Sequence, residues 1–388
     1  MFKSLSVGFA IYLVLITLNS RLIDDSLAEI YKTGKVRIIP EATITNDSML
    51  DGDIFESPTD LAEDKDANIY IVDYRANNIK VFDANLKYKK IIGRKGQGPG
   101  ELYGPAEIDC TSRYLLVREI LNRRISFFDL AGHFIRSAPV TSGAGTISKI
   151  RAVPDGRILV SRDKAYTSDL ENKEECTIEL YSSEFEFIKT VYSHAVKKRM
   201  MAAGPSAKVL PVPFAADVYW DVMKDGKIAL GYSDKYEIEI YGLETGKERV
   251  ITRRYKPIRI TEDDKDYFLK HLSSVSFTDS GASNLRRVTG DLWRLMKFPK
   301  YKTAFLDLRV DSEGNIWVGP EFGNPDRATT NYDIFSAAGV FINRIVIKLP
   351  EGVIGLRSSA IMRPRGFWLL LRSQMDEPIV VKTRICAL

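Results

Sequence analysis

Residues 68–105, NIYIVDYRANNIKVFDANLKYKKIIGRKGQGPGELYGP, contain three short strand-like runs and a glycine-rich return. Asn68 to Asp73 is an apolar run rich in β-branched residues, Asn78 to Phe82 alternates in polarity, and Lys89 to Gly93 ends in glycine. Turn-forming residues separate the runs, as they do between the strands of antiparallel hairpins. The stretch therefore predicts three consecutive strands of a small antiparallel sheet.

The same unit recurs along the chain, each time as a turn followed by an apolar second strand. Second strands are expected to begin at six positions: Ile69, Tyr114, Ile158, Ile228, Ile316 and Phe367. Third strands are expected to end at five aromatic residues, and the sixth to span an apolar segment: Phe82, Phe128, Tyr181, Tyr241, Phe335 and Ile379–Ile385. Two intervals are enlarged, and the others are close to the ~40 to 50 residues of one propeller blade. The repeats predict an all-β fold, a six-bladed β-propeller of four-stranded antiparallel blades, as one domain over residues 33–388.

Three pieces of the first copy resemble the NHL repeat of six-bladed β-propellers. They are Asp64 to Asp73, Asn78 to Asp83 and Gly93 to Leu102, with Lys80 as a mild departure from the repeat pattern. Further along, an insertion, then Phe298-Pro299, then residues 311–318 resemble a group of exported bacterial six-bladed propellers of mostly unassigned function. The resemblance implies the fold and says little about activity, because propellers host unrelated functions.

The sixth copy lacks a fourth strand, and a strand from the other end of the chain is expected to supply it. Lys35 to Thr45, KVRIIPEATIT, has strand composition with Pro40 in the middle. Proline cannot donate a ladder hydrogen bond, so it restricts such a strand to an edge or a bulge. We expect Lys35–Thr45 to pair with Ile379–Ile385 and so to close the last blade.

Residues 1–20 have the pattern of a signal peptide. Lys3 precedes an apolar run of 14 residues, Leu5 to Leu18, and polar residues follow it. The run is shorter than the ~20 residues that span a bilayer, and an uncleaved membrane anchor is the alternative interpretation. The segment predicts a periplasmic or secreted protein.

Two connections between blades are enlarged and basic. His194 to Phe214 is expected to be an irregular loop, and residues 257–302, between blades 4 and 5, a partly helical insertion with an N-cap at Thr261 and a second helix from Asn284 to Met296. Within these connections, the stretches His194 to Lys208 and Asn284 to Lys302 contain ten basic residues against the single acid Asp291: Lys197, Lys198, Arg199, Lys208, Arg286, Arg287, Arg294, Lys297, Lys300 and Lys302. The whole chain carries a net charge of only +5, so positive charge is concentrated in these insertions.

All of the long connections are expected on one face of the ring, since they follow second or fourth strands, whereas the short turns follow first or third strands. Variable loops gathered on one side of a rigid scaffold are typical of a binding site. The sequence therefore favours a non-catalytic exported scaffold that binds a protein, a glycan or another anionic partner, and needs no cofactor. Export argues against nucleic acid, and a membrane is involved only if the leader is retained. The candidate binding residues are Arg75, Asn78, Lys197, Lys198, Arg199, Arg286 and Arg287.

Several apparent catalytic or metal-binding patterns fail. The glycines between Gly93 and Gly100 lack the following helix that a phosphate-binding loop requires. Asp64, Asp66 and Asn68 copy the start of a calcium loop, but Ile69 stands where that loop needs its glycine, so a hairpin turn is the better interpretation. The three histidines are scattered, no G-x-S-x-G motif occurs, and three widely spaced cysteines predict no disulfide framework.

An enzymatic alternative remains open. Some six-bladed propellers are lactonases that hold a divalent metal such as calcium in the central channel. By that analogy, inner-strand carboxylates of Glu107, Asp217 and Asp307 would be ligands in a metal-dependent lactone or ester hydrolase. The interpretation of these residues as polar channel lining competes with it.

Overall fold

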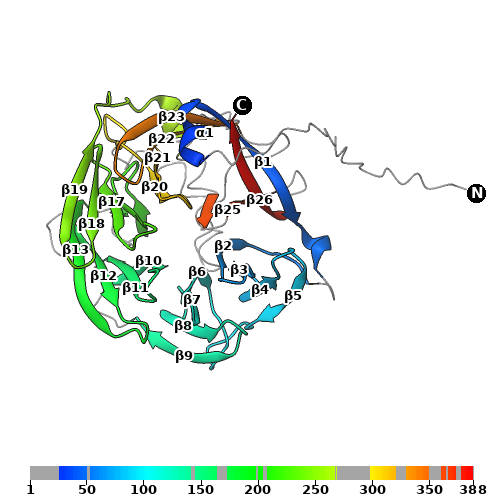
Figure 1. The fold of residues 1–388 in the computed structure, drawn as a ribbon. Helices are drawn as coiled ribbons and strands as arrows, with labels where there is room; N and C mark the ends of the chain where they lie inside the picture. The colour runs from blue at the N-terminus through cyan, green and yellow to red at the C-terminus, as the bar shows by residue number, and fades with distance from the viewer. Residues whose placement is uncertain are drawn as a thin grey trace, which may run out of the picture.

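The structure is a computed structural model that describes residues 26–49, 53–140, 145–163, 173–197, 200–203, 208–266, 268, 298–319, 329–348, 360–363, 366–372 and 377–387. Antiparallel sheets stand around a central axis, with their first strands innermost (Figure 1). The described residues form the predicted propeller of four-stranded blades.

The strand bounds follow the order of the chain. Blade 1 comprises β2 (Pro58–Glu63), β3 (Ile69–Asp73), β4 (Asn78–Phe82) and β5 (Tyr88–Ile92). Blade 2 comprises β6 (Pro105–Cys110), β7 (Tyr114–Glu119), β8 (Arg124–Asp129) and β9 (Phe134–Pro139). Blade 3 comprises β10 (Thr146–Ala152), β11 (Ile158–Asp163), β12 (Lys173–Tyr181) and β13 (Phe187–Lys197).

The second half of the ring repeats this plan. Blade 4 comprises β16 (Val218–Val222), β17 (Ile228–Tyr232), β18 (Glu237–Gly242) and β19 (Gly246–Thr252). Blade 5 comprises β20 (Asp307–Val310), β21 (Ile316–Gly319), β22 (Thr329–Phe335) and β23 (Phe341–Lys348). Blade 6 comprises β24 (Ala360–Arg363), β25 (Gly366–Arg372), β26 (Pro378–Ala387) and, from the start of the chain, β1 (Lys35–Ile44).

Five of the six second strands begin at the expected residue, and β25 begins one residue early at Gly366. The aspartate before each of two second strands explains the tight turn. Asp64 accepts hydrogen bonds from the backbone N–H groups of Asp66 and Asn68 and from the Tyr70 hydroxyl. Asp311 repeats this pattern in blade 5. The sequence at Asp64 that resembles a calcium loop therefore forms a hairpin turn, as predicted.

Neighbouring blades pack face to face, and this explains why the second strands are apolar throughout. All five residues of β3 are buried, and one apolar core joins blade 1 to blade 2 through side chains such as Val72, Ile79, Ile108 and Leu115. A strand that is covered on both faces needs a continuous apolar run rather than alternation.

The predicted ring closure is confirmed, and β1 also makes a second contact. It pairs antiparallel with β26 from Val36 to Ile44, with a register shift between Pro40 and Ala42, where the proline was expected to force a bulge or an edge. Residues 35–37 also pair in parallel with residues 346–348 of β23. Because of this pairing, β1 joins blades 5 and 6 into one eight-stranded mixed sheet (Figure 1).

A short helix, α1 (Leu27–Lys32), secures the start of β1 to blade 5. Tyr31 is fully buried, its hydroxyl donates to Asp311 Oδ2 at 2.8 Å, and its ring meets Trp317 edge-on at 5.3 Å. The segment before β1 therefore contributes to the core. A 3₁₀ turn, η1 (Asn46–Ser48), follows β1.

The first insertion corrects one expectation. The region from His194 to Phe214 is not an irregular loop throughout, since β13 extends to Lys197 and β14 (Met200–Ala203) pairs with β15 (Lys208–Pro211) as a hairpin. Backbone pairing of β14 with β15 accounts for this segment, and Pro211 is tolerated because it is the last residue of β15.

The second insertion begins as predicted. Residues 262–266 are helical, and Thr261 and Asp264 cap this turn reciprocally, Thr261 Oγ1 accepting from the Asp264 N–H and Asp264 Oδ2 from the Thr261 N–H. The rings of Phe214, Phe268 and Phe298 contact one another, with centroids 5.6 to 6.2 Å apart. This aromatic cluster holds the two insertions together. The expected helix from Asn284 to Met296 lies outside the described residues.

Prediction on ring closure. A chain that begins at Met49 lacks α1 and β1, and it should aggregate or melt well below a chain that begins at Leu27, because blade 6 loses its outer strand and blade 5 its Tyr31 contact. A chain that begins at Lys35 should fall between the two. Thermal melting followed by circular dichroism measures the difference. Equal melting of the Met49 and Leu27 chains would contradict the role of β1.

Candidate functional site

A cleft of about 870 Å³ opens where blade 4 meets blade 5. Its walls are residues 253–259, which follow β19, and Tyr301, Thr303 and Ala304, which precede β20. The two segments pair near one end, where Lys302 N–H donates to the Ile258 carbonyl at 2.9 Å and Ile260 N–H to the Lys300 carbonyl at 3.2 Å. Because both segments lie between a fourth strand and a first strand, the cleft is on the long-loop face.

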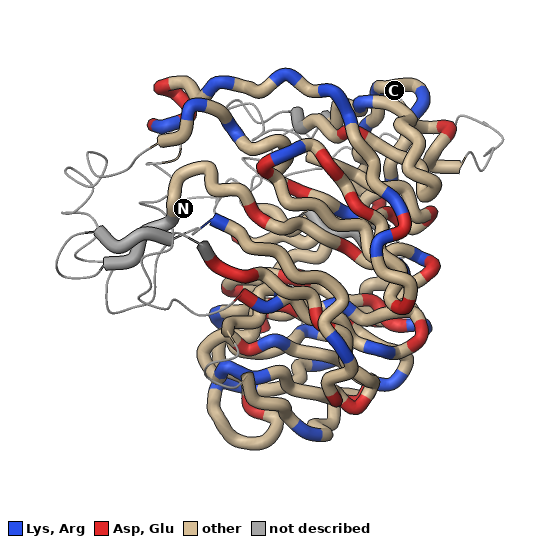
Figure 2. The backbone as a smooth tube through the Cα atoms, turned by 90° about the vertical axis from the view of Figure 1, so that its left-hand side faces the viewer, with Lys and Arg blue, Asp and Glu red and all other residues tan. Residues whose placement is uncertain are grey.

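The lining of this cleft is strongly cationic. Among the described residues, the lining contains five basic side chains and no carboxylate: Arg253, Arg254, Lys256, Arg259 and Arg344. Arg254, Lys256 and Arg259 are exposed, and no carboxylate among the described residues pairs with them. On the side of the ring that Figure 2 shows, by contrast, basic and acidic residues are interspersed along most of the backbone. The cleft is therefore a local concentration of unneutralised positive charge.

One buried carboxylate lies behind the cleft and fixes its other two cations. Asp333 is fully buried, and Arg344 binds it through two hydrogen bonds of 2.7 and 3.0 Å. Arg253 pairs with the same carboxylate, and the Tyr236 hydroxyl donates to it at 2.6 Å. Burial raises the pKa of Asp333, but the bonds from Arg344, Tyr236 and Arg253 outweigh burial and hold the pKa below its usual value of 3.8. This cluster joins blade 4 to blade 5 and positions two arginines at the cleft wall.

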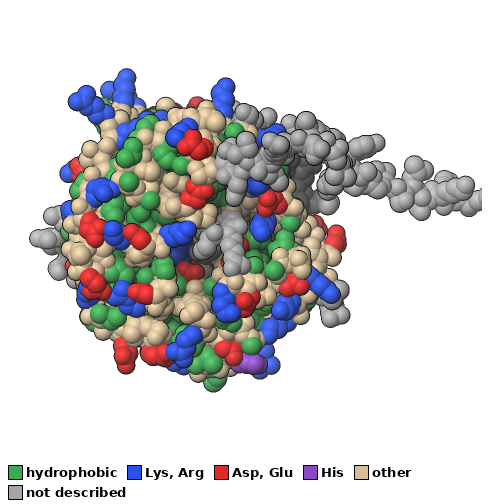
Figure 3. Space-filling model, viewed as in Figure 1, with side chains coloured by type: hydrophobic (Ala, Val, Ile, Leu, Met, Phe, Trp, Pro, Cys, Tyr) green, Lys and Arg blue, Asp and Glu red, His purple; other side chains and the backbone are tan. Residues whose placement is uncertain are grey.

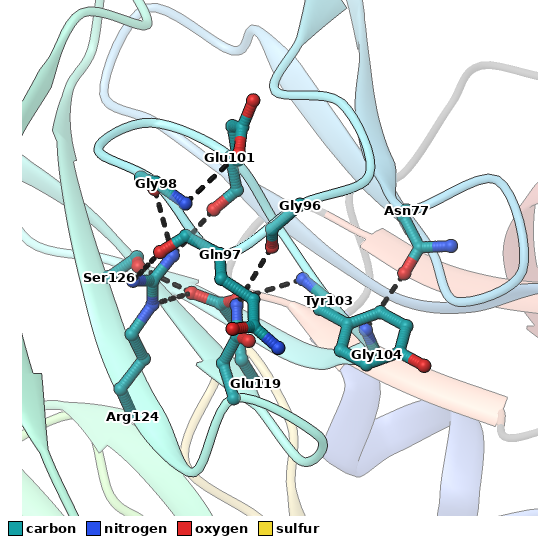
Figure 4. A network of polar contacts seen from close by, with 11 residues as sticks. Asn77, Gly96, Gln97, Gly98, Glu101, Tyr103, Gly104, Glu119, Arg124 and Ser126 are labelled. Carbon is teal, nitrogen blue, oxygen red and sulfur yellow. Dashed lines mark hydrogen bonds and ion pairs between the residues drawn. The ribbon is translucent and has the colours of Figure 1, made fainter.

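The glycine-rich connection from Gly93 to Gly104 is held by a separate polar network on blade 2 (Figure 4). Arg124 donates to the carbonyls of Gln97, Gly98 and Glu101. Glu119, also buried, pairs with Arg124 at 2.8 Å and accepts the Tyr103 N–H. A phosphate-binding loop presents backbone N–H groups to its ligand. This loop instead presents three carbonyl groups, and the Arg124 guanidinium binds them. The connection is structural, as the sequence suggested.

Of the candidate binding residues, the described part of the chain includes Arg75, Asn78 and Lys197, which lie in blades 1 and 3. Arg75 is exposed and Asn78 half-buried, both in blade 1, on the opposite side of the ring from the cleft (Figure 1). Asn78 Oδ1 accepts a hydrogen bond from Lys80 at 3.1 Å, and Lys197 is exposed at the end of β13. Lys198, Arg199, Arg286 and Arg287 lie outside the described residues.

Sequence reasoning missed the cations of the cleft. The run Arg253 to Arg259, RRYKPIR, contains four basic residues among seven, a signal that was available. The expected insertion begins at Pro257, in the middle of this run, so its four basic residues did not count as one group. Arg344 carried no local signal, because it reaches the cleft only through the packing of β23 beside β19.

The inner strands place carboxylates along the central channel, where they connect successive blades. Asp60 Oδ2 accepts the N–H of Ile108, Glu107 Oε2 that of Ile150, and Asp221 Oδ2 that of Val310, each at 3.1 Å. These bonds run from the inner strand of one blade to that of the next. In this role each carboxylate helps to hold the ring in register.

The three residues of the metal hypothesis have such structural partners. Glu107 also pairs with Arg118 at 3.2 Å, and Asp307 pairs with Arg309 at 2.6 Å and accepts the Tyr332 hydroxyl at 3.0 Å. Asp217 lies one residue before β16 and accepts the Val218 N–H at 2.8 Å. Among the described residues, no three His, Cys, Asp or Glu side chains gather closely enough to hold a metal ion.

Cations accompany these carboxylates in the channel. Lys149 on β10 donates to the Trp220 carbonyl of blade 4, and Arg151 lies 3.4 Å from Asp221. Burial, reinforced by Arg151, lowers the pKa of Lys149 to about 8. Charged side chains of both signs are visible around the middle of the ring (Figure 3). The channel is thus a mixed ion-pair network, unlike the unpaired charge of the cleft.

Comparison with known proteins agrees with this architecture. The model of the DUF5128 family, described as a 6-bladed beta-propeller, matches residues 45–201. No curated protein matches the chain. The chain is a six-bladed β-propeller, and its fold is similar to that of two Bacteroides proteins.

Two solved structures share the fold over most of their length. One is a protein described as exported from Bacteroides fragilis, with 13% identity and a TM-score of 0.55, covering 90% of this chain and 95% of that one. The other is a member of the DUF4221 family from Bacteroides vulgatus, with 10% identity and a TM-score of 0.51, covering 92% and 100%. At such identities the likeness shows the fold alone. A gluconolactonase from Xanthomonas campestris has a TM-score of 0.42, 8% identity and coverages of 85% and 87%, and supports no inference on activity.

Prediction on Asp333. The substitution Asp333→Asn should destabilise the protein by roughly 2 kcal/mol at pH 7, less than the ~3 to 5 kcal/mol of a fully buried pair, because Arg253 and Arg344 keep access to solvent. The lowered pKa means that the contribution is present above about pH 4 and is lost as the pH falls through the folded-state pKa. Melting at pH 7 and at pH 3 should show a difference from wild type that shrinks at pH 3. A constant difference would contradict the charge assignment.

Prediction on Glu107. The substitution Glu107→Gln should lower the melting temperature, because Arg118 loses its charged partner, while the metal content of the purified protein stays unchanged. The exposed pair Glu41–Arg384 offers a control, and Glu41→Gln should change melting very little. Elemental analysis measures the metal. A stoichiometric ion that is present in the wild type and lost in Glu107→Gln would establish the metal-site alternative instead.

Proposed function

We propose that this protein is an exported, non-catalytic scaffold that binds an anionic macromolecular partner through its long-loop face, with the cleft between blades 4 and 5 at the centre of that surface. The observation that carries this proposal is the set of Arg254, Lys256 and Arg259, which are exposed at the cleft with no described carboxylate to neutralise them. Surface cations in ordinary proteins are interspersed with acids, as they are along most of the backbone on the side that Figure 2 shows.

The geometry of the cleft supports binding rather than chance accumulation of charge. The walls pair with each other through backbone hydrogen bonds, and Ala304, buried at the base, donates its N–H to the Ser233 carbonyl at 2.8 Å. A cleft of about 870 Å³ is within the size range of sites that enclose a ligand segment. The cations are thus mounted on a fixed backbone, which reduces the entropy lost on binding.

Export is supported by the apolar leader at residues 5–18 and by the exported description of one protein with the same fold. Among the described residues, which begin at Ser26, no helix has the length and apolar character to cross a membrane. An exported scaffold meets proteins and glycans rather than nucleic acid, and anionic forms of these are the partners that the cleft suits.

No observation favours the hydrolase alternative over the scaffold. The channel carboxylates that it requires, Glu107 and Asp307, already bind arginines and groups of neighbouring strands. A metal ion would have to displace Arg118 or Arg309 from contacts of 3.2 and 2.6 Å. Glu107 also links the inner strands of blades 2 and 3, whereas the partners of Asp307 lie within blade 5.

Prediction on the cleft cations. The triple substitution Arg254→Ser, Lys256→Ser and Arg259→Ser should weaken binding to two immobilised polyanions, polygalacturonate and poly-L-glutamate, by roughly tenfold at low salt, since exposed charge contacts contribute up to ~1 kcal/mol each. Binding of the wild type should also fall as ionic strength rises, because salt screens such contacts. Surface plasmon resonance measures both effects.

The control removes the same charge from the opposite face. Lys65, Lys87 and Lys224 are exposed on short turns, and their replacement by serine should leave binding nearly unchanged. A second triple, Lys197→Ser, Lys198→Ser and Arg199→Ser, tests whether the other insertion takes part. The proposal is wrong if neither polymer binds the wild type, or if the cleft triple and the short-turn triple behave alike.

A further inference from the structure

Two tyrosines line the cationic cleft, one from each of its two walls. Tyr255 lies in the segment that follows β19, and Tyr301 in the segment that precedes β20. Both remain substantially exposed, at 36% and 40%, although large aromatic side chains are usually buried. Aromatic rings that stay open to solvent beside a cluster of cations indicate a ligand with both a flat apolar surface and negative charge.

Each ring is braced on one side. Tyr255 packs on the buried Tyr236, with ring centroids 5.7 Å apart, and Lys300 lies over the ring of Tyr301 at 5.3 Å. Neither tyrosine hydroxyl has a hydrogen-bond partner among the described residues. The two rings therefore offer supported apolar surface, and each also offers a free hydroxyl that can donate or accept.

We propose that the cleft binds an acidic polysaccharide, with Tyr255 and Tyr301 stacking on sugar rings while Arg254, Lys256 and Arg259 bind the carboxylate or sulfate groups. This inference rests on the proposed function and names its ligand class. One face of a pyranose ring carries mainly C–H groups, which pack against the electron-rich face of an aromatic ring, and its hydroxyls extend to the edges. Arginine matches planar carboxylates and sulfates through paired N–H donors.

An acidic peptide suits the cleft less well. A peptide often binds by adding a strand to a free sheet edge, but residues 258–260 and 300–302 already pair with each other. The acidic side chains of a peptide would pair with the cations, but a polyanionic peptide offers no flat apolar surface on which the tyrosine rings can stack. Stacking on the two tyrosine rings therefore favours a sugar polymer over other polyanions.

The test compares two polymers on the mature chain, polygalacturonate and poly-L-glutamate at equal charge concentration. The double substitution Tyr255→Leu and Tyr301→Leu should weaken polygalacturonate binding by roughly tenfold and leave polyglutamate binding within about twofold, because leucine keeps the bulk and removes the ring. Tyr103, which also has a lysine over its ring at 5.6 Å, provides the control, and Tyr103→Leu should change neither affinity.

The outcomes separate the two levels of the proposal. Equal weakening of both polymers, or of neither, would overturn the polysaccharide inference while leaving an anion-binding scaffold in place. Absence of binding to either polymer would remove the proposed function itself. Thermal melting checks that the variants fold. Tyr255 packs on the buried Tyr236, so the double variant can be unstable. In that case the single substitution Tyr301→Leu tests the inference, because the ring of Tyr301 contacts the surface residue Lys300.

Discussion

The closure of the ring is the constraint on which the rest of the structure depends. Each blade buries both faces of its second strand against its neighbours, so an open end would expose a face as apolar as that of β3. Carboxylates of the inner strands reinforce three of the junctions by accepting N–H groups from the next blade, as Asp60, Glu107 and Asp221 do. The strand β1 completes the ring by pairing with both β26 and β23.

This scaffold explains why a charged cleft can exist at the junction of blades 4 and 5. Like charges repel one another, and five cations in one cleft lower the stability of the surface that carries them. Asp333 offsets two of them from behind, and the backbone pairing of the two walls fixes the remainder. The rigidity of the blades allows the loops to retain an arrangement that favours a negatively charged ligand over a well-paired surface.

The sequence predicted what depends on burial and local hydrogen bonds. The second strands were located because burial on both faces requires an apolar run, and the turn at Asp64 because its aspartate bonds to residues two and four positions ahead. The parallel pairing of β1 with β23 involves only residues 35–37 and leaves no pattern in the sequence. The partners that Glu107 and Asp333 have in a neighbouring blade, Ile150 for Glu107 and Tyr236 and Arg253 for Asp333, come from distant parts of the chain, so only the assembled ring shows them.

Hydrogen exchange of the wild-type chain with and without polygalacturonate tests the central claim most directly, because it maps where the polyanion lies without any substitution. The account predicts slower amide exchange in residues 253–259 and 301–304, and little change in the short turns around Lys65, Lys87 and Lys224. Protection on the short-turn face, or protection spread evenly over all six blades, would contradict a binding site in this cleft.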